Sequence, residues 1–120
     1  MRAKTIQEGF AIPATAQTAN GTTLDLSVHP QDAVVAPGSS CVLAIQLLGA
    51  KSTPGDLLSL QTSNDGGTTW QTAASYALTG SAESRMFFIG SVLLGQQNRL
   101  SVTTSGTNGA GTVNAYILKD

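Results

Sequence analysis

Apolar and polar side chains alternate along much of this chain with a period of two residues. The alternation is clearest in the segments 24–28, 58–62, 99–103 and 113–117. A period of two places successive side chains on opposite faces of a β-strand, so that one face is buried and the other exposed. No segment carries a sustained period of 3.6 residues with capping residues at its ends. The pattern therefore predicts β-strands and little or no helix.

Two further segments, 41–48 and 85–94, are apolar at almost every position, so both faces of the strands they predict are apolar. Such a strand is either central and covered on both faces, or it presents one face to another subunit. Both interpretations stay open at this point, and the second favours a homo-oligomer. The candidate interface residues in these two segments are Val42, Ala44, Leu48, Phe87, Phe88 and Ile89.

Clusters of Gly, Pro, Ser, Thr and Asn separate the apolar segments. They lie at 36–39, 53–56, 79–81 and 105–109, which leaves room for seven or eight short strands. That spacing predicts an all-β fold, an antiparallel β-sandwich of the Greek-key or jelly-roll type. The order of the strands in the sheets stays undetermined.

The first 21 residues differ from the rest because the segment 12–21 consists mainly of small residues without a core pattern. We predict an extended N-terminal arm over residues 1–21 and a sandwich domain over residues 22–120. In this prediction Ile12 and Pro13 contact a partner. The alternative is an ordinary terminus paired at the edge of a sheet.

Composition narrows the classes of partner. The chain has 120 residues, enough for one domain; charged residues make up 11%, against about 25% in an ordinary soluble protein. Six basic residues form no patch that could neutralise several phosphates, so nucleic acid is not expected as a ligand. The sequence contains no basic amphipathic segment, so binding to a membrane surface is not expected either. Cys41 is the single cysteine, which excludes an internal disulfide and predicts a small buried apolar residue.

Candidate catalytic and metal-binding residues are sparse. A Ser-His-Asp site would need the single histidine, His29, with Asp25 or Asp32 beside it, but the sequence has no Gly-x-Ser-x-Gly turn. The Cys and His spacings of zinc sites are absent, and so is the acidic ligand that would complete a calcium loop. We therefore expect no catalytic residue, no cofactor and no metal, and hence a protein that is not an enzyme.

One motif carries more information than any other part of the chain. Residues 63–70 read Ser-Asn-Asp-Gly-Gly-Thr-Thr-Trp and match the S-x-D-x-G-x-T-W pattern of the Asp box. The glycines suit the positive φ angles of a tight hairpin, and the Asp carboxylate is expected to accept backbone N–H groups two residues further on. In sialidases this motif lies on hairpin turns that are remote from the catalytic site. It predicts a structural hairpin formed by Ser63, Asp65, Gly67, Thr69 and Trp70.

The Asp-box hairpin, the C-terminal segment 100–118 and the stretch 12–21 resemble small β-sandwich proteins of tailed-bacteriophage virions, above all head decoration (cement) proteins. The resemblance implies a structural protein that binds the lattice of the major capsid protein, often as a trimer. It also implies synthesis in the host cytoplasm, with which the absence of a secretory signal agrees, and a final location on the virion. The alternative is a carbohydrate-binding module or a tail-fibre domain, for which Trp70, Tyr76 and Tyr116 are the candidate platforms for sugar rings.

Overall fold

The computed structural model describes residues 2–26, 38 and 40–119, and these residues form nine β-strands and no helix. The predicted all-β class is confirmed. None of the described residues belongs to a helix that could cross a membrane. In chain order the strands are β1 (Arg2–Ala11), β2 (Gln17–Asn20), β3 (Leu24–Asp25), β4 (Ser40–Lys51), β5 (Leu57–Ser63), β6 (Gln71–Ala77), β7 (Glu83–Leu93), β8 (Gln97–Thr104) and β9 (Ala110–Lys119).

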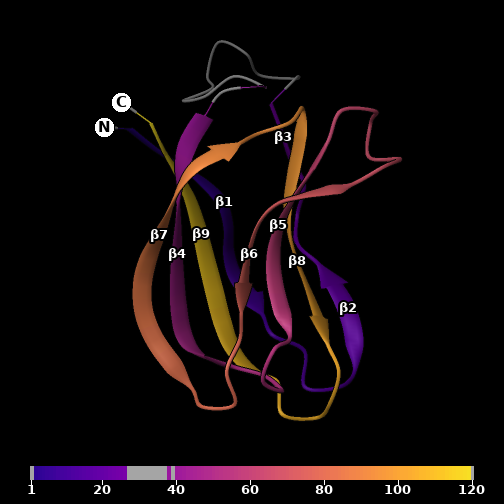
Figure 1. Cartoon of the computed structure of the whole chain (residues 1–120), viewed down its shortest axis with the longest axis vertical. Helices are drawn as coiled ribbons and strands as arrows, with labels where there is room; N and C mark the ends of the chain where they lie inside the picture. The colour runs from indigo at the N-terminus through magenta and orange to yellow at the C-terminus, as the bar shows by residue number, and fades with distance from the viewer. Residues whose placement is uncertain (1, 27–37, 39, 120) are drawn as a thin grey trace.

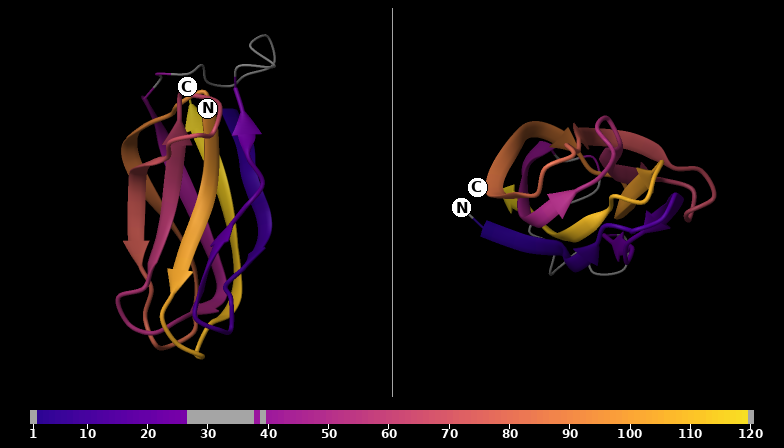
Figure 2. Two further views of the ribbon diagram at one scale, coloured as in Figure 1. Left: turned by 90° about the vertical axis from the view of Figure 1, so that its right-hand side faces the viewer. Right: turned by 90° about the horizontal axis from the view of Figure 1, so that it is seen from below.

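Two antiparallel sheets face each other (Figures 1 and 2). The first sheet has the order β1-β9-β4-β7, and the second has the order β2-β8-β5-β6, with the short β3 also paired to β8. The chain stays in the same sheet from β2 to β3 and from β5 to β6, and every other connection crosses to the opposite sheet. This order is that of a jelly roll, in which two Greek keys form the two sheets of one sandwich.

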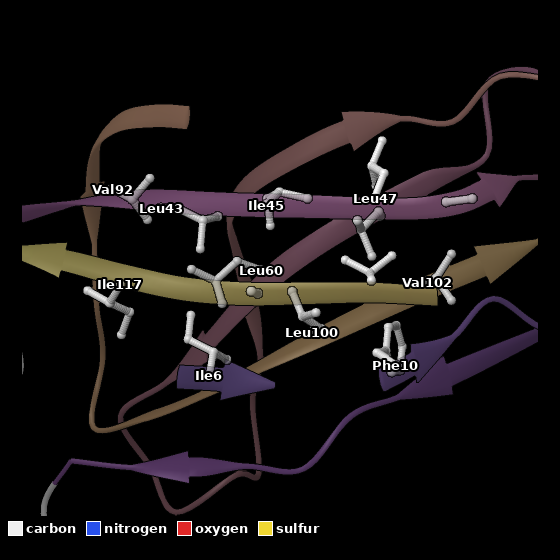
Figure 3. Packing of buried hydrophobic residues seen from close by; sticks show 14 of the residues in the cluster. Ile6, Phe10, Leu43, Ile45, Leu47, Leu60, Val92, Leu100, Val102 and Ile117 are labelled. Carbon is white, nitrogen blue, oxygen red and sulfur yellow. The ribbon is translucent and has the colours of Figure 1, made fainter. Parts of the chain in front are cut away.

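The core fills the space between the sheets, with side chains from both (Figure 3). Alternate residues of the central strands point inward, as the period of two predicted. These side chains are at most 2% exposed: Leu43, Ile45 and Leu47 on β4, Leu58 and Leu60 on β5, Leu100 and Val102 on β8, and Val113, Ala115 and Ile117 on β9.

The prediction of an extended N-terminal arm is wrong. Strand β1 pairs with β9 along the edge of the first sheet, and β2 pairs with β8 in the second. Ile6, Phe10 and Ile12 lie in the core, where each is at most 7% exposed. Residues 2–20 therefore belong to the sandwich, which is why it has nine strands instead of seven or eight. Two irregularities in the pairing of β1 with β9 break its alternation and hide the strand from a search for period two.

A bulge also changes the phase of β7. Two residues, Gly90 and Ser91, lie opposite Val42 alone, and Ser91 adopts the left-handed conformation with a φ of 58°. Beyond the bulge Val92 points inward and is 2% exposed, while Leu93 is 60% exposed. Strict alternation from Phe88 would have placed Val92 on the outer face.

Candidate functional site

The outer face of the first sheet is apolar over three neighbouring strands. We define this apolar face by the residues Val42, Ala44 and Leu48 of β4, Met86 and Phe88 of β7, and Tyr116 and Leu118 of β9. Strand pairing brings them together, since Ala44 lies opposite both Phe88 and Tyr116, and Val42 lies opposite Leu118. All seven alternate with residues that point into the core, so their side chains lie on the outside of the sandwich.

Large side chains on the apolar face are open to solvent. Phe88 is 60% exposed, Met86 46% and Leu48 43%. Ala44 is only 3% exposed because the larger side chains on the two neighbouring strands flank its methyl group. The chief polar pair on this face is Gln46 and Asn114, and the Asn114 side-chain amide donates a hydrogen bond of 3.1 Å to Gln46 Oε1. The face is therefore largely apolar and carries no charge among these residues.

The structure divides the predicted interface residues into two groups. Val42, Ala44, Leu48 and Phe88 lie on the apolar face. Phe87 and Ile89 do not, because they point inward and pack against the core.

The two interface candidates of the N-terminal segment also lie elsewhere. Ile12 is 4% exposed within the core, and the partly buried Pro13 lies against Gly109. Tyr116 and Leu118 belong to the apolar face, although they were not among the predicted interface residues. They alternate with core residues of β9, so the sequence could have indicated their outward position once the strand order was known.

The outer face of the second sheet is polar, in contrast to the first. Ser59, Gln61, Ser101 and Thr103 line a shallow hollow of about 310 Å³ there, together with residues 55–57. Leu57 is the large apolar side chain at its margin and is 47% exposed. The two outer faces of the sandwich thus differ in chemistry, and the first sheet presents the larger apolar surface.

The Asp-box residues form the β5–β6 hairpin turn. The Ser63 hydroxyl donates to Asp65 Oδ1 at 2.7 Å and accepts the backbone N–H of Gly67 at 3.0 Å. The backbone N–H of Thr69 donates to Asp65 Oδ1 at 2.9 Å. Gly66 and Gly67 have φ angles of 76° and 90°, which a residue with a side chain rarely adopts.

These contacts correct one detail of the sequence interpretation. The acceptor for the N–H of Gly67, two residues beyond Asp65, is Ser63 Oγ, and Asp65 instead accepts from Thr69, four residues on. The backbone N–H of Thr69, with the hydroxyls of Ser63 and Thr69, lowers the pKa of Asp65 from 3.8 to about 2. Asp65 is therefore a charged structural acceptor at neutral pH, and its Oδ1 is committed to the turn.

Trp70 lies over the outer side of the second sheet, not in the core. Its indole N–H donates to the Gly67 carbonyl at 2.9 Å. The guanidinium of Arg99 on β8 lies 3.9 Å from the centre of the Trp70 ring, and Arg99 Nε also donates to Gln61 Oε1 at 3.0 Å. The ring is thus held between the turn and the Arg99 guanidinium of β8, and these contacts stabilise the hairpin.

A second carboxylate connects two loops at the opposite end of β5, a contact that the sequence analysis did not identify. The backbone N–H and the hydroxyl of Ser105 donate to the carboxylate of Asp56 at 3.0 and 2.7 Å, and the Ser52 hydroxyl donates at 2.6 Å. These bonds, led by that of Ser52, lower the pKa of Asp56. Ser105 lies 49 residues away from Asp56 in the sequence, so only the folded chain reveals this contact.

The residues considered for catalysis form no site in the described part of the chain. His29 and Asp32 lie outside the described residues, and Asp25 accepts a hydrogen bond of 3.4 Å from the Gln97 amide. Within residues 2–26, 38 and 40–119 no three His, Cys, Asp or Glu side chains are grouped as metal ligands. Cys41 is buried, and burial raises the pKa of its thiol.

Comparison with models of protein families, with curated proteins and with solved structures found no match for this chain.

Proposed function

We propose that this protein is a non-enzymatic structural protein of a bacteriophage virion, which binds the major capsid protein on the outside of the capsid as a homo-oligomer. The apolar face is the proposed attachment surface. The observation that carries the proposal is the group of exposed apolar side chains on that face, with Phe88 60% exposed and Met86, two residues before it on β7, 46% exposed.

Exposed apolar surface of this kind favours binding to another protein. Large contiguous apolar patches are rare on monomeric proteins and mark sites of interaction when they occur. Burial of such surface contributes about 25 cal/mol per Å² removed from water. An open, uncharged sheet face is suited to binding a protein surface, whereas small-molecule sites are concave.

Two further features support a structural role. The jelly roll is a frequent architecture of viral capsid and lectin domains, although the fold alone does not decide function. Charged residues make up only 11% of the chain, which is consistent with attachment through shape complementarity, apolar burial and neutral hydrogen bonds. The resemblance of the Asp-box and C-terminal segments to head decoration proteins points in the same direction.

The carbohydrate-binding alternative is less well supported, because two of its three candidate platforms are engaged within the chain. Arg99 lies over the ring of Trp70, and Phe87 packs against the ring of Tyr76 with a centroid distance of 4.5 Å. A sugar ring needs an open aromatic face for stacking. Tyr116 remains, and it lies on the apolar face.

Co-sedimentation tests the proposal, with empty heads assembled from the major capsid protein of the genome that encodes this chain. We expect the purified protein to sediment with the heads and Phe88→Ser to weaken that binding at least tenfold. Leu57→Ser is the matched control, because Leu57 is similarly exposed, at 47%, on the polar outer face. Failure to bind, or equal binding by Phe88→Ser and the native chain, would overturn the proposed attachment surface.

A further inference from the structure

Strand β7 forms an edge of the first sheet. It pairs with β4 along one side, and no other described strand pairs with it along the other (Figure 1). The strand has 11 residues, from Glu83 to Leu93. The backbone N–H and C=O groups of alternate residues along a free edge point outward and can pair with another strand.

The other sheet edges are shorter, more polar or less regular. Strand β1 has two irregularities and carries Lys4 and Glu8. Strands β2 and β3 have four and two residues, and β6 has seven, of which Gln71 and Thr72 are exposed. Edges with bulges, charges or few residues resist pairing with further strands. Strand β7 also carries two charges, Glu83 and Arg85, but its segment 84–89 pairs without interruption and is apolar from Met86 to Ile89. This segment is the longest regular stretch at a sheet edge in the described residues.

We propose that two copies of this chain pair through their β7 strands, antiparallel and related by a twofold axis. The pairing extends the first sheet across both copies to eight strands. This inference concerns the chain alone and does not depend on the proposed binding to a capsid.

The charges along β7 permit this pairing. With the twofold axis at residue 86, the paired residues 83–89 all precede the bulge, so each residue faces one on the same side of the sheet. In this register Arg85 faces Phe87 of the second copy, and Glu83 faces Ile89. An axis at residue 87 or 88 would pair residues across the bulge at Gly90 and Ser91, where the alternation changes phase. No two like charges meet, whereas like charges directly opposite each other would destabilise the pair.

Side chains near the edge are left incompletely covered by the single chain. Phe87 and Ile89 point inward, yet both stay partly exposed, in contrast to the 1–2% exposure of Leu43 and Ile45 on β4. A small apolar crevice of about 10 Å³ lies beside Ile89, between the two sheets. The Arg85 guanidinium lies 5.0 Å from the centre of the Phe87 ring and donates a hydrogen bond to Tyr76 of β6, so it covers part of this side. A second β7 strand would cover the exposed parts of Phe87 and Ile89 that remain.

The available area suits a weak dimer. The seven residues 83–89 that pair about an axis at residue 86 span about 24 Å, and two sheets with their outer side chains are about 20 Å deep. The paired part of the sandwich side thus offers roughly 480 Å² per partner, which is in the range of weak, transient interfaces. Pairing also brings Met86 and Phe88 of one copy beside those of the other, on the same outer face.

The pairing has a consequence for the apolar face. A twofold axis perpendicular to the sheet leaves both apolar faces on the same side of the dimer, where they form one continuous surface. Two linked binding faces would increase the avidity for a repeating lattice. The pairing yields a dimer, whereas the resemblance to decoration proteins implies a trimer.

Sedimentation velocity of the purified full chain over a range of micromolar concentrations provides the first test. We expect a species of twice the 12.2 kDa chain mass. Met86→Lys combined with Phe88→Lys places four lysines next to the twofold axis and is expected to weaken the dimer by about a hundredfold. Leu57→Lys, at a similarly exposed position on the polar outer face, should leave the dimer intact. A thermal melt of each variant confirms that it is folded.

Hydrogen exchange distinguishes pairing through β7 from other modes of association. Alternate backbone amides between residues 84 and 89 should exchange more slowly at concentrations where the dimer forms. A monomer at every concentration, a trimer, or a dimer whose β7 amides exchange as fast as in the monomer would overturn the inference. These outcomes are independent of any capsid, so failure of capsid binding leaves the inference unaffected.

Discussion

Gly109 lies so close to the carbonyl of Pro13 that a Cβ atom on Gly109 would lie 1.6 Å from that oxygen. The contact joins the segment that follows β1 to the turn that precedes β9. Beside it, the backbone N–H of Ile12 donates to the Gly111 carbonyl at 3.0 Å. The segment after β1 is therefore held against the β8–β9 connection and the start of β9 by backbone contacts that leave no space for a side chain on Gly109.

Replacement of Gly109 by alanine is expected to destabilise the fold. The new methyl group would meet backbone atoms, which cannot rotate away as a flexible side chain could, so the segment 12–13 must shift. Overpacking of this kind costs about 1–3 kcal/mol. Chemical denaturation of Gly109→Ala measures the loss of unfolding free energy.

Gly90→Ala is the matched control for that substitution. A Cβ atom on Gly90 would have no atom within 4 Å, and the φ of Gly90 is not in the left-handed region. We expect its unfolding free energy to stay close to that of the native chain. An equal loss in the two variants would show that the close approach at Pro13 is not the cause.

Truncation of Ile6 tests whether β1 is an integral part of the core. Ile6 is 6% exposed, and Ile6→Ala is expected to cost about 2–5 kcal/mol because it leaves a cavity among the core side chains. Glu8→Ala, at an exposed position of the same strand, should have little effect. Denaturation curves that are unchanged by Ile6→Ala would restore the interpretation of an independent arm.

Acid should weaken the Asp-box hairpin in a defined range of pH. The folded-state pKa of Asp65 is about 2, below the ordinary value of 3.8 expected for the unfolded chain, because Thr69 and Ser63 donate hydrogen bonds to the carboxylate. The unfolded chain therefore binds the proton more readily. The contribution of Asp65 to the free energy of unfolding is present above pH 3.8 and is lost as the pH falls from 3.8 towards about 2.

Asp65→Asn checks this assignment, because the amide keeps an oxygen acceptor but loses the charge. At neutral pH we expect its melting temperature to be a few degrees lower than that of the native chain, and near pH 2 the two should converge. Fluorescence of Trp70, the single tryptophan, follows the unfolding of the hairpin directly. A constant difference between the two chains across this range would contradict the assignment.

Attachment to a capsid should depend little on salt if the apolar face makes the contact. Exposed ion pairs contribute under about 1 kcal/mol each and are screened by salt, whereas apolar burial is not weakened by screening. Affinity for assembled heads, measured at low and moderate ionic strength, is expected to stay within about threefold. A large loss of binding at moderate salt would indicate that charged side chains outside the apolar face make the contact.

How well each feature could be predicted from the sequence depended on how far apart in the chain its contacting residues lie. The Asp-box hairpin could be predicted because its bonds join residues at most four apart, although the sequence did not show which oxygen accepts which N–H. The period of two predicted the inward-pointing residues of β5, β8 and β9, whereas the segment of β4 is apolar on both faces. Strand β1 escaped prediction because its bulges interrupt the alternation, and its burial depends on pairing with β9, more than 100 residues away.

The sequence by itself determined the all-β class, the turn at residues 63–70 and a small, weakly charged domain, because these follow from local conformational preference and composition. Only the tertiary structure decided which apolar residues are core and which are surface. Phe87 and Phe88 are adjacent and chemically identical, but the pleat turns one towards the core and leaves the other 60% exposed. Which neighbour points inward depends on the side of the strand that the opposite sheet covers, and contacts between residues distant in the sequence determine that side.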